Sequence, residues 1–175
     1  MKLVLAVLLL MVASGNAQSA TLDGPAAFQR LTSLVGDWEG RSEWSGARTG
    51  TGKMNATYYL TGNSSALVEN LIVESSPVMT TVYHLDHSDL RMTHFCAAKN
   101  QPRLKASKID LQKGVIDFAF VDVTNVPSLD APFVHGLEVQ LLDPYKIVLT
   151  FTFEAAGKKS YERIDLKRVA AHAAK

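Results

Sequence analysis

The sequence is poor in cysteine, with Cys96 as the only one among its 175 residues. A single thiol cannot form an internal disulfide, so a fold stabilised by intramolecular cross-links is excluded. A lone thiol in a folded domain is most often buried and unreactive, and we expect Cys96 to lie inside the protein beside His94. Stability must therefore come from the packing of apolar side chains.

An excess of one charge sign is also missing. The chain has 18 lysine and arginine residues against 17 aspartate and glutamate residues, and without Lys2 the two counts are equal. A chain without net charge has no long-range attraction for nucleic acid or for an anionic membrane surface. Neither is expected as a partner.

Long hydrophobic runs are absent apart from one near the start. Met1 and Lys2 precede an apolar run from Leu3 to Val12, and small residues follow up to Ala17. This order is typical of a cleavable secretory signal peptide at residues 1–17. The run has about ten residues, whereas a membrane-spanning helix needs about 20, so no membrane span is predicted. We expect an exported protein, located in the periplasm or outside the cell.

The remaining chain has the length of one domain and contains no internal repeat. Gly24 and Pro25 are typical of a helix start, and apolar residues recur at helical spacing from Phe28 to Val35. The sequence thus predicts a lead-in with one short helix at residues 18–35, a single β-barrel domain at 36–170 and a tail at 171–175.

From Asp37 onward, apolar residues alternate with polar ones in short runs separated by glycine, asparagine, aspartate and proline. This pattern predicts antiparallel strands joined by hairpin turns. Ten such strands in sequence order would leave two exposed edges unless the sheet closed on itself. We therefore predict an all-β fold, a ten-stranded antiparallel meander barrel, with strands near residues 37–45, 53–61, 66–74, 79–86, 90–98, 103–110, 114–123, 134–142, 146–155 and 159–169.

The segment Gly36-Asp37-Trp38-Glu39-Gly40 resembles the first strand of calycin barrels, a group that includes lipocalins. The segments 82–85, 93–96 and 100–103 resemble exported bacterial lipocalin-like proteins of unassigned function. The resemblance implies a calycin-like barrel in which Trp38 closes the base beneath an arginine of the last strand. Arg168 shares the apolar face of that strand and is the expected partner, in a cation–π contact of about 1 to 2 kcal/mol.

Polar residues on the apolar faces of three predicted strands form the main candidate site. Hairpin pairing places Thr81 opposite His94 and Tyr83 opposite Met92, and it places Tyr58 opposite Glu69. A tight turn at Ser76 and Pro77 would then pair Glu69 with Tyr83. The sequence therefore predicts a cluster of Tyr58, Glu69, Tyr83, His94 and Cys96 on one wall of the barrel interior, with His84 on the outside.

Several chemistries are compatible with this cluster. His94 and Cys96 are ligand types for zinc or copper, but two ligands do not make a site, so no metal is predicted. A nucleophilic Cys96 activated by His94 is disfavoured, since alternate residues on a strand lie about 7 Å apart. Haem bound through His94 and an acid–base pair of Glu69 and His94 remain alternatives. No cofactor and no catalytic residue is identified.

Asn100 and Arg103 flank a proline in the loop expected before the sixth strand. Their hydrogen-bond donors could hold a ligand carboxylate or amide at the barrel mouth, or they could satisfy the loop itself. The leading hypothesis is a monomeric, exported barrel that binds a small, partly apolar molecule in its interior, with Tyr58, Glu69, Tyr83, His94 and Arg103 fixing the polar end of the ligand. The alternatives are a barrel enzyme and a solidly packed interaction protein.

Overall fold

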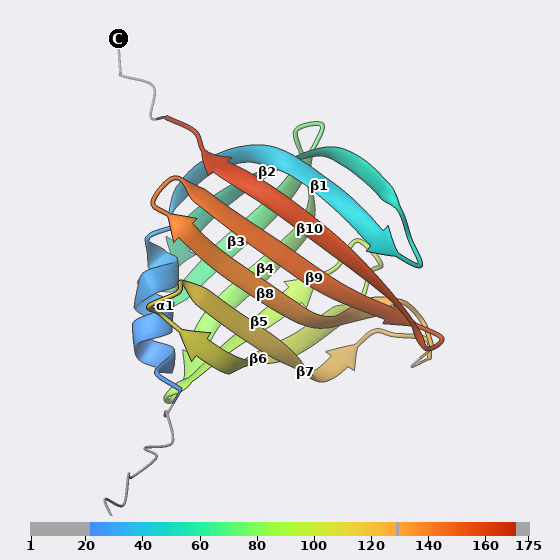
Figure 1. The fold of residues 1–175 in the computed structure, drawn as a ribbon. Coiled ribbons are helices and arrows are strands. Elements are labelled where there is room, and N and C mark those ends of the chain that lie inside the picture. Colours follow the sequence, from blue (N-terminus) through green and yellow to red (C-terminus); the bar gives the residue numbers. More distant parts are fainter. Residues whose placement is uncertain (1–21, 129, 171–175) are drawn as a thin grey trace, which may run out of the picture.

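The fold is seen in a computed structural model that describes residues 22–128 and 130–170. The predicted signal peptide at 1–17 and tail at 171–175 lie outside the described residues. Ten antiparallel strands, each hydrogen-bonded to its neighbours in the sequence, form a closed barrel in which the first strand also pairs with the last (Figure 1). The predicted meander barrel is confirmed. None of the helices in the described part of the chain is long and apolar enough to cross a membrane.

The helix and strands lie close to the predicted positions, with ends shifted by a few residues. Their bounds are α1 (Gly24–Thr32), β1 (Gly36–Gly46), β2 (Gly50–Thr61), β3 (Ala66–Val73), β4 (Ser76–Asp86), β5 (Asp89–Phe95), β6 (Gln101–Asp110), β7 (Val115–Thr124), β8 (Phe133–Asp143), β9 (Lys146–Ala155) and β10 (Lys158–Arg168).

Helix α1 lies across one end of the barrel and makes its contacts with β4, β5 and β6 (Figure 1). The Asp23 side chain caps its start by accepting a hydrogen bond from the backbone N–H of Ala26 at 2.9 Å. Phe28 and Leu31 are buried in the core, as the helical spacing predicts. Val35 was also expected to face the core, but its side chain is 43% exposed because the helix ends at Thr32 and the chain turns into β1.

This end, which we call the closed end, is sealed by the predicted tryptophan–arginine pair. Trp38 lies opposite Arg168 in the β1–β10 register, and the guanidinium lies 4.3 Å from the centroid of the indole ring. The indole N–H donates to the Leu34 carbonyl at 2.8 Å. Arg168 donates to the carbonyls of Ser33, Val35 and Pro144, so it ties the start of β1 to the β8–β9 turn.

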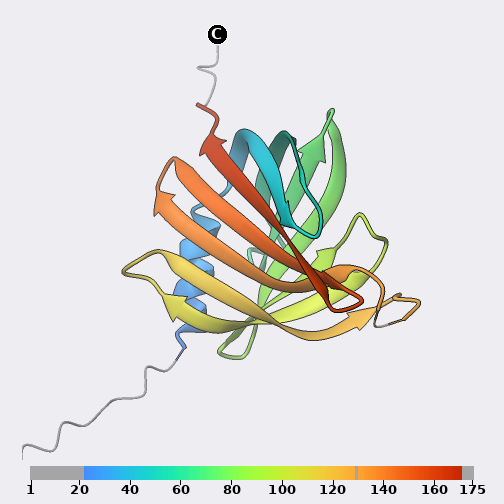
Figure 2. The ribbon, with the colours of Figure 1, turned by 45° about the vertical axis from the view of Figure 1, so that its right-hand side comes forward.

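The opposite end, which we call the mouth, is formed by the loops that join β1 to β2, β3 to β4, β5 to β6, β7 to β8 and β9 to β10 (Figures 1 and 2). The β5–β6 loop contacts the connection between β7 and β8: the side-chain amide of Asn100 donates to the carbonyl of Pro132 at 2.9 Å. That hydrogen bond fixes the longest connection to the β5–β6 loop.

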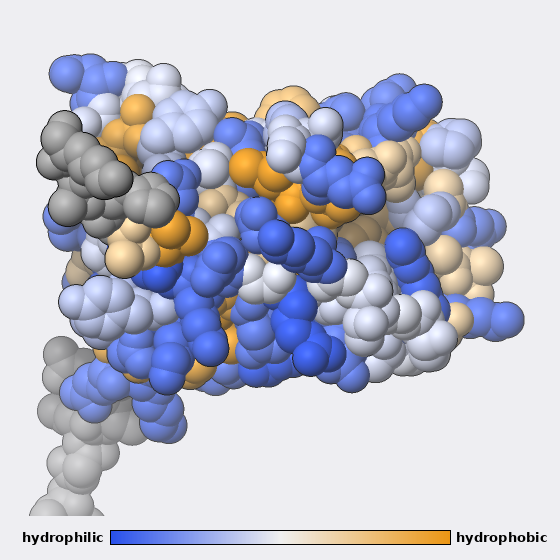
Figure 3. Space-filling view, turned by 90° about the horizontal axis from the view of Figure 1, so that it is seen from above, coloured by the Kyte–Doolittle hydropathy of each residue, from blue (hydrophilic) through white to orange (hydrophobic). Residues whose placement is uncertain are grey.

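The outer wall is polar. Figure 3 views the molecule from the side uppermost in Figure 1, where β1, β2 and β10 lie, and shows mostly hydrophilic residues with smaller hydrophobic patches between them. The alternation of buried and exposed residues along these strands produces this division.

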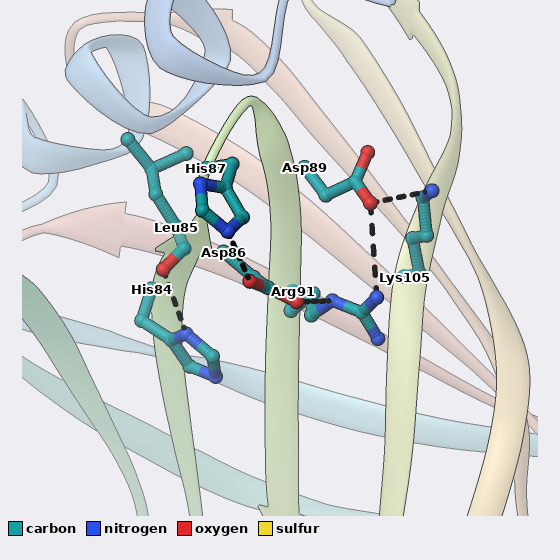
Figure 4. A network of polar contacts seen from close by, with 7 residues as sticks. All are labelled: His84, Leu85, Asp86, His87, Asp89, Arg91 and Lys105. Atoms are coloured by element: carbon teal, nitrogen blue, oxygen red, sulfur yellow. Dashed lines mark hydrogen bonds and ion pairs between the residues drawn. The ribbon is translucent and has the colours of Figure 1, made fainter.

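The β4–β5 hairpin near α1 carries a network of ion pairs on its outer face (Figure 4). Arg91 pairs with Asp86 at 2.9 Å, and Lys105 of β6 pairs with Asp89 at 2.7 Å. Lys105 is the main cause of the lowered pKa of Asp89. His84 lies on this outer side and is partly exposed, as predicted. The network joins β4, β5 and β6 beneath the helix and needs no ligand to complete it.

Candidate functional site

The predicted interior cluster forms around Glu69, a fully buried carboxyl on β3. Tyr58 of β2 lies opposite Glu69, as predicted, and its hydroxyl donates to Glu69 Oε2 at 2.7 Å. Thr81 of β4 donates to Glu69 Oε1 at 3.1 Å. Both carboxyl oxygens therefore have partners from the neighbouring strands.

Tyr83 joins the cluster by a different register from the one predicted. The tight turn lies at Glu74 and Ser75, both with positive φ, and the register shifts close to it, between Leu71 and Ile72. Thr81, not Tyr83, is therefore the partner of Glu69. The shift of two residues keeps Tyr83 on the same face of the sheet, and its hydroxyl still donates to Glu69 Oε2 at 3.1 Å.

His94 of β5 is linked to the cluster through Thr81, its predicted partner across the hairpin. Thr81 Oγ1 lies 2.9 Å from His94 Nδ1. Because the threonine hydroxyl already donates to Glu69, the proton of the imidazole is assigned to Nδ1. The other nitrogen, Nε2, is buried without a hydrogen-bond partner, and the ring packs on Phe151 with 5.0 Å between centroids.

Burial dominates the electrostatics of this cluster. It raises the pKa of Glu69 against the opposing effect of three hydroxyl donors, and it raises the pKa values of Tyr58 and Tyr83 well above their usual range. It also lowers the pKa of His94 to about 4, so the imidazole is neutral at physiological pH. In this cluster the imidazole and the two phenols are therefore uncharged, and the carboxyl of Glu69 accepts hydrogen bonds from three hydroxyls.

The enclosed geometry bears on the alternatives raised from the sequence. Glu69 and His94 contact each other through Thr81, and neither side chain lines either of the mouth cavities described below. Haem bound through His94 does not fit, because the ring is fully buried against Phe151. Within residues 22–128 and 130–170, no group of three or more His, Cys, Asp and Glu side chains is arranged to hold a metal ion.

Arg103 does not contribute to the interior. It was expected in a loop at the mouth, but β6 already begins at Gln101, and Arg103 faces outward. There it forms a two-pronged ion pair with Asp122 of β7, with 2.7 Å from Nη2 to Oδ2. Its binding partner is therefore part of the protein's own surface.

Asn100 and Cys96 lie at the mouth. Asn100 is buried, and its side-chain amide donates to the β7–β8 connection. Of the two alternatives for this loop, its donor thus satisfies the protein's own backbone. Cys96 is buried as predicted, but it follows the end of β5 and lines a mouth cavity, which His94 does not. Burial and, to a lesser degree, the nearby Glu162 raise the pKa of its thiol, so Cys96 stays protonated and unreactive.

A second cluster at the mouth was not predicted. Two cavities of about 700 and 460 Å³ open there and adjoin each other, since they share four lining residues; we call them the two lobes of the mouth cavity. The shared residues are Trp44, Arg48, Met54 and Glu162. Met79 and Phe153 add apolar surface to the smaller lobe, and backbone and polar side chains of β2 line the larger one.

Glu162 is the polar centre of this space. It lies opposite Trp44 in the β1–β10 register and is only 2% exposed. Its Oε2 has no hydrogen-bond partner. Burial raises its pKa to about 7, while the charge of Arg48 and hydrogen bonding from Trp44 and Ser42 counter that rise in part. A buried, unpartnered carboxyl beside a cavity is able to bind a group that a ligand supplies.

Trp44 and Arg48 complete the mouth cluster. The guanidinium of Arg48 stacks 3.8 Å from the centroid of the Trp44 ring, which also packs on Phe153 at 4.9 Å. A sequence signal for part of this cluster exists. Glu162 follows the same alternation as Ile164, Leu166 and Arg168, which places it on the inner face of the last strand.

Comparisons with known proteins support the fold alone. No family model matches the chain, and no curated protein matches it. A solved structure of Rv2717c from M. tuberculosis is similar with a TM-score of 0.53 and 15% identity, covering 82% of this chain and 97% of that one. A Nostoc punctiforme protein of unknown function from the DUF3598 family is similar with a TM-score of 0.55 and 12% identity, covering 79% of this chain and 48% of that one. Both likenesses agree with a lipocalin-like barrel.

Proposed function

We propose that this protein is exported and binds a small, partly apolar molecule in its mouth cavity. The observation that carries the proposal is the position of Glu162: a buried carboxyl with an unpartnered oxygen lines a space of several hundred Å³ beside an indole ring. Cavities of this size and mixed lining are typical of small-molecule sites. The signal-peptide pattern at residues 1–17 supports export.

The proposal differs from the sequence-based hypothesis in the location of the ligand. The cluster of Tyr58, Glu69, Tyr83 and His94 is buried and satisfies most of its own polar atoms. It extends towards the closed end, where Tyr58 packs edge-on against Trp38, and none of its four side chains lines the mouth cavity. We therefore propose that the ligand binds between Trp44, Phe153 and Glu162 rather than beside Glu69.

Native mass spectrometry of protein purified from its own host tests the proposal. We expect a small molecule to co-purify with the wild-type protein and to be lost from the Trp44→Ala variant, which removes one wall of the cavity. The Tyr145→Ala variant is the matched control, because it removes an exposed aromatic ring from the closed end. Equal retention by both variants would place the ligand elsewhere and overturn the proposal.

A further inference from the structure

The polar group at the mouth that lacks a hydrogen-bond partner is a carboxyl, the acidic side chain of Glu162. Glu162 is buried, and within the described residues no lysine, arginine or histidine nitrogen forms an ion pair with it. Its unpartnered Oε2 belongs to a side chain that lines both lobes of the cavity. A carboxyl in this setting gains most from a donor or a positive charge that arrives with the ligand.

The position beside it already contains a cation. The guanidinium of Arg48 lies over the Trp44 ring at 3.8 Å, and Trp44 is the cross-strand partner of Glu162. The backbone of the loop is fixed, since Ala47 N–H donates to the Lys159 carbonyl and Arg48 N–H donates to Ser160 Oγ. The exposed Arg48 side chain, in contrast, forms no hydrogen bond or ion pair with any described residue. It is held to the site by stacking and can move away from the ring without disturbing the backbone.

We infer that the mouth cavity is selective for an organic cation with an apolar or aromatic body, and that the Arg48 guanidinium occupies the cation position over Trp44 until a ligand replaces it. This inference rests on the proposed function and specifies its ligand class. The cationic group of the ligand stacks on Trp44 and donates to Glu162, while its body lies against Met79 and Phe153.

Three probes with the same benzyl body test the inference by isothermal titration calorimetry at pH 8. Benzylguanidinium carries the proposed group, benzylurea is its neutral isostere, and phenylacetate carries the opposite charge. We expect wild-type protein to bind benzylguanidinium about tenfold or more tightly than benzylurea, and phenylacetate least. Glu162→Gln should remove this preference, since it removes the charge and keeps the shape.

The Arg48→Gln variant tests the self-occupied position. Removing a competing cation should tighten the binding of benzylguanidinium severalfold. Arg163→Gln is the matched control, because Arg163 is an exposed arginine beside Glu162 in the chain that points outward and pairs with Asp165. That variant loses the same charge from the outer face of β10, away from the cavity, and should leave the affinity unchanged.

The other results separate the inference from the proposed function. Tighter binding of phenylacetate, lost in Arg48→Gln, would make Arg48 a carboxylate-binding residue and would overturn the cation inference alone. Equal binding of all three probes would do the same and leave the cavity as a binding site. Absence of binding by every probe, to wild type and to Arg48→Gln, together with no co-purifying molecule, would overturn both.

Discussion

Strand β1 has a tryptophan near each of its ends, and each of these rings stacks with an arginine from another segment. The two arginines differ in the other contacts that hold them. Trp38 is 1% exposed, and its partner Arg168 donates to three backbone carbonyls. Trp44 is partly exposed, and its partner Arg48 has the ring as its main contact. The same two residue types thus form a fixed plug at the closed end and a replaceable contact at the mouth. The difference lies in the hydrogen bonds from the guanidinium to backbone carbonyls, which hold Arg168 but are not formed by Arg48 with any described residue.

The two buried glutamates show the same contrast. Burial raises the pKa of both Glu69 and Glu162. Three hydroxyls donate to Glu69, whereas Glu162 keeps an unpartnered oxygen beside a cavity. A raised carboxyl pKa is therefore shared by a structural cluster and a candidate site, and the hydrogen-bond partners and the adjoining space distinguish them.

Trp38→Ala should produce the largest loss of stability. It removes a large, fully packed ring and the plug under Arg168, so we expect the free energy of unfolding to fall by about 3 to 5 kcal/mol. Trp44→Ala removes a ring that already borders open space and should cost less than half as much. Urea unfolding measures both. Similar losses would mean that the mouth is as tightly packed as the closed end.

Glu162→Gln should change the stability by a smaller amount that depends on pH. The pKa of Glu162 is raised from 4.5 to about 7, so its favourable contribution is complete below pH 4.5 and is lost as pH rises through 7. Above that range the charged carboxyl costs on the order of 3 kcal/mol, which the neutral amide avoids. We therefore expect Glu162→Gln to be more stable than wild type at pH 8.5 and equally stable at pH 4.

The matched control for this titration is Glu43→Gln, on the exposed face of β1. It should leave the stability nearly unchanged at both pH values. His94 titrates in the same window with the opposite effect, but it is present in all three proteins and cancels from the differences. A pH-independent effect of Glu162→Gln would show that Glu162 is not buried in solution.

The smallest effects are expected from the two arginines. Arg168→Gln removes hydrogen bonds to three carbonyls and should lower the free energy of unfolding by about 2 kcal/mol. Arg48→Gln removes a single stacking contact at the surface and should cost about 0.5 kcal/mol or less. Thermal unfolding of both variants at one pH provides the comparison. A loss of stability in Arg48→Gln as large as that in Arg168→Gln would contradict the inference that a ligand can replace the Arg48 side chain.

Local sequence patterns were sufficient for much of the barrel. Turn residues and alternation fix pairs within a hairpin, such as Tyr58 with Glu69 and Thr81 with His94. The pairing of Tyr83 was wrong by two residues because a turn with positive φ at Glu74 and a nearby bulge do not show in the alternation. The even shift preserved the face, so Tyr83 still joins the cluster, whereas Cys96 lies past the end of β5 at the mouth.

The mouth site was missed because its residues come together only through the fold. Trp44 and Glu162 are more than 100 residues apart in the chain, and barrel closure makes them partners. The position of Arg48 depends on the loop between β1 and β2, for which alternation gives no information. The inward face of Glu162 was readable from its spacing to Arg168, but the same spacing indicates nothing about an adjoining cavity.

The pairing of β1 with β10 also has a consequence for folding. Every other strand pair joins neighbours in sequence, whereas this one closes a loop of nearly the whole domain and carries the largest entropic cost of chain closure. Because Trp44 and Glu162 lie opposite each other in that pairing, the proposed binding site is completed by the same event that completes the barrel. A ligand at the proposed site would contact both strands and stabilise their pairing, so occupancy should protect the backbone amides of β1 and β10 from hydrogen exchange more than those of any other strands.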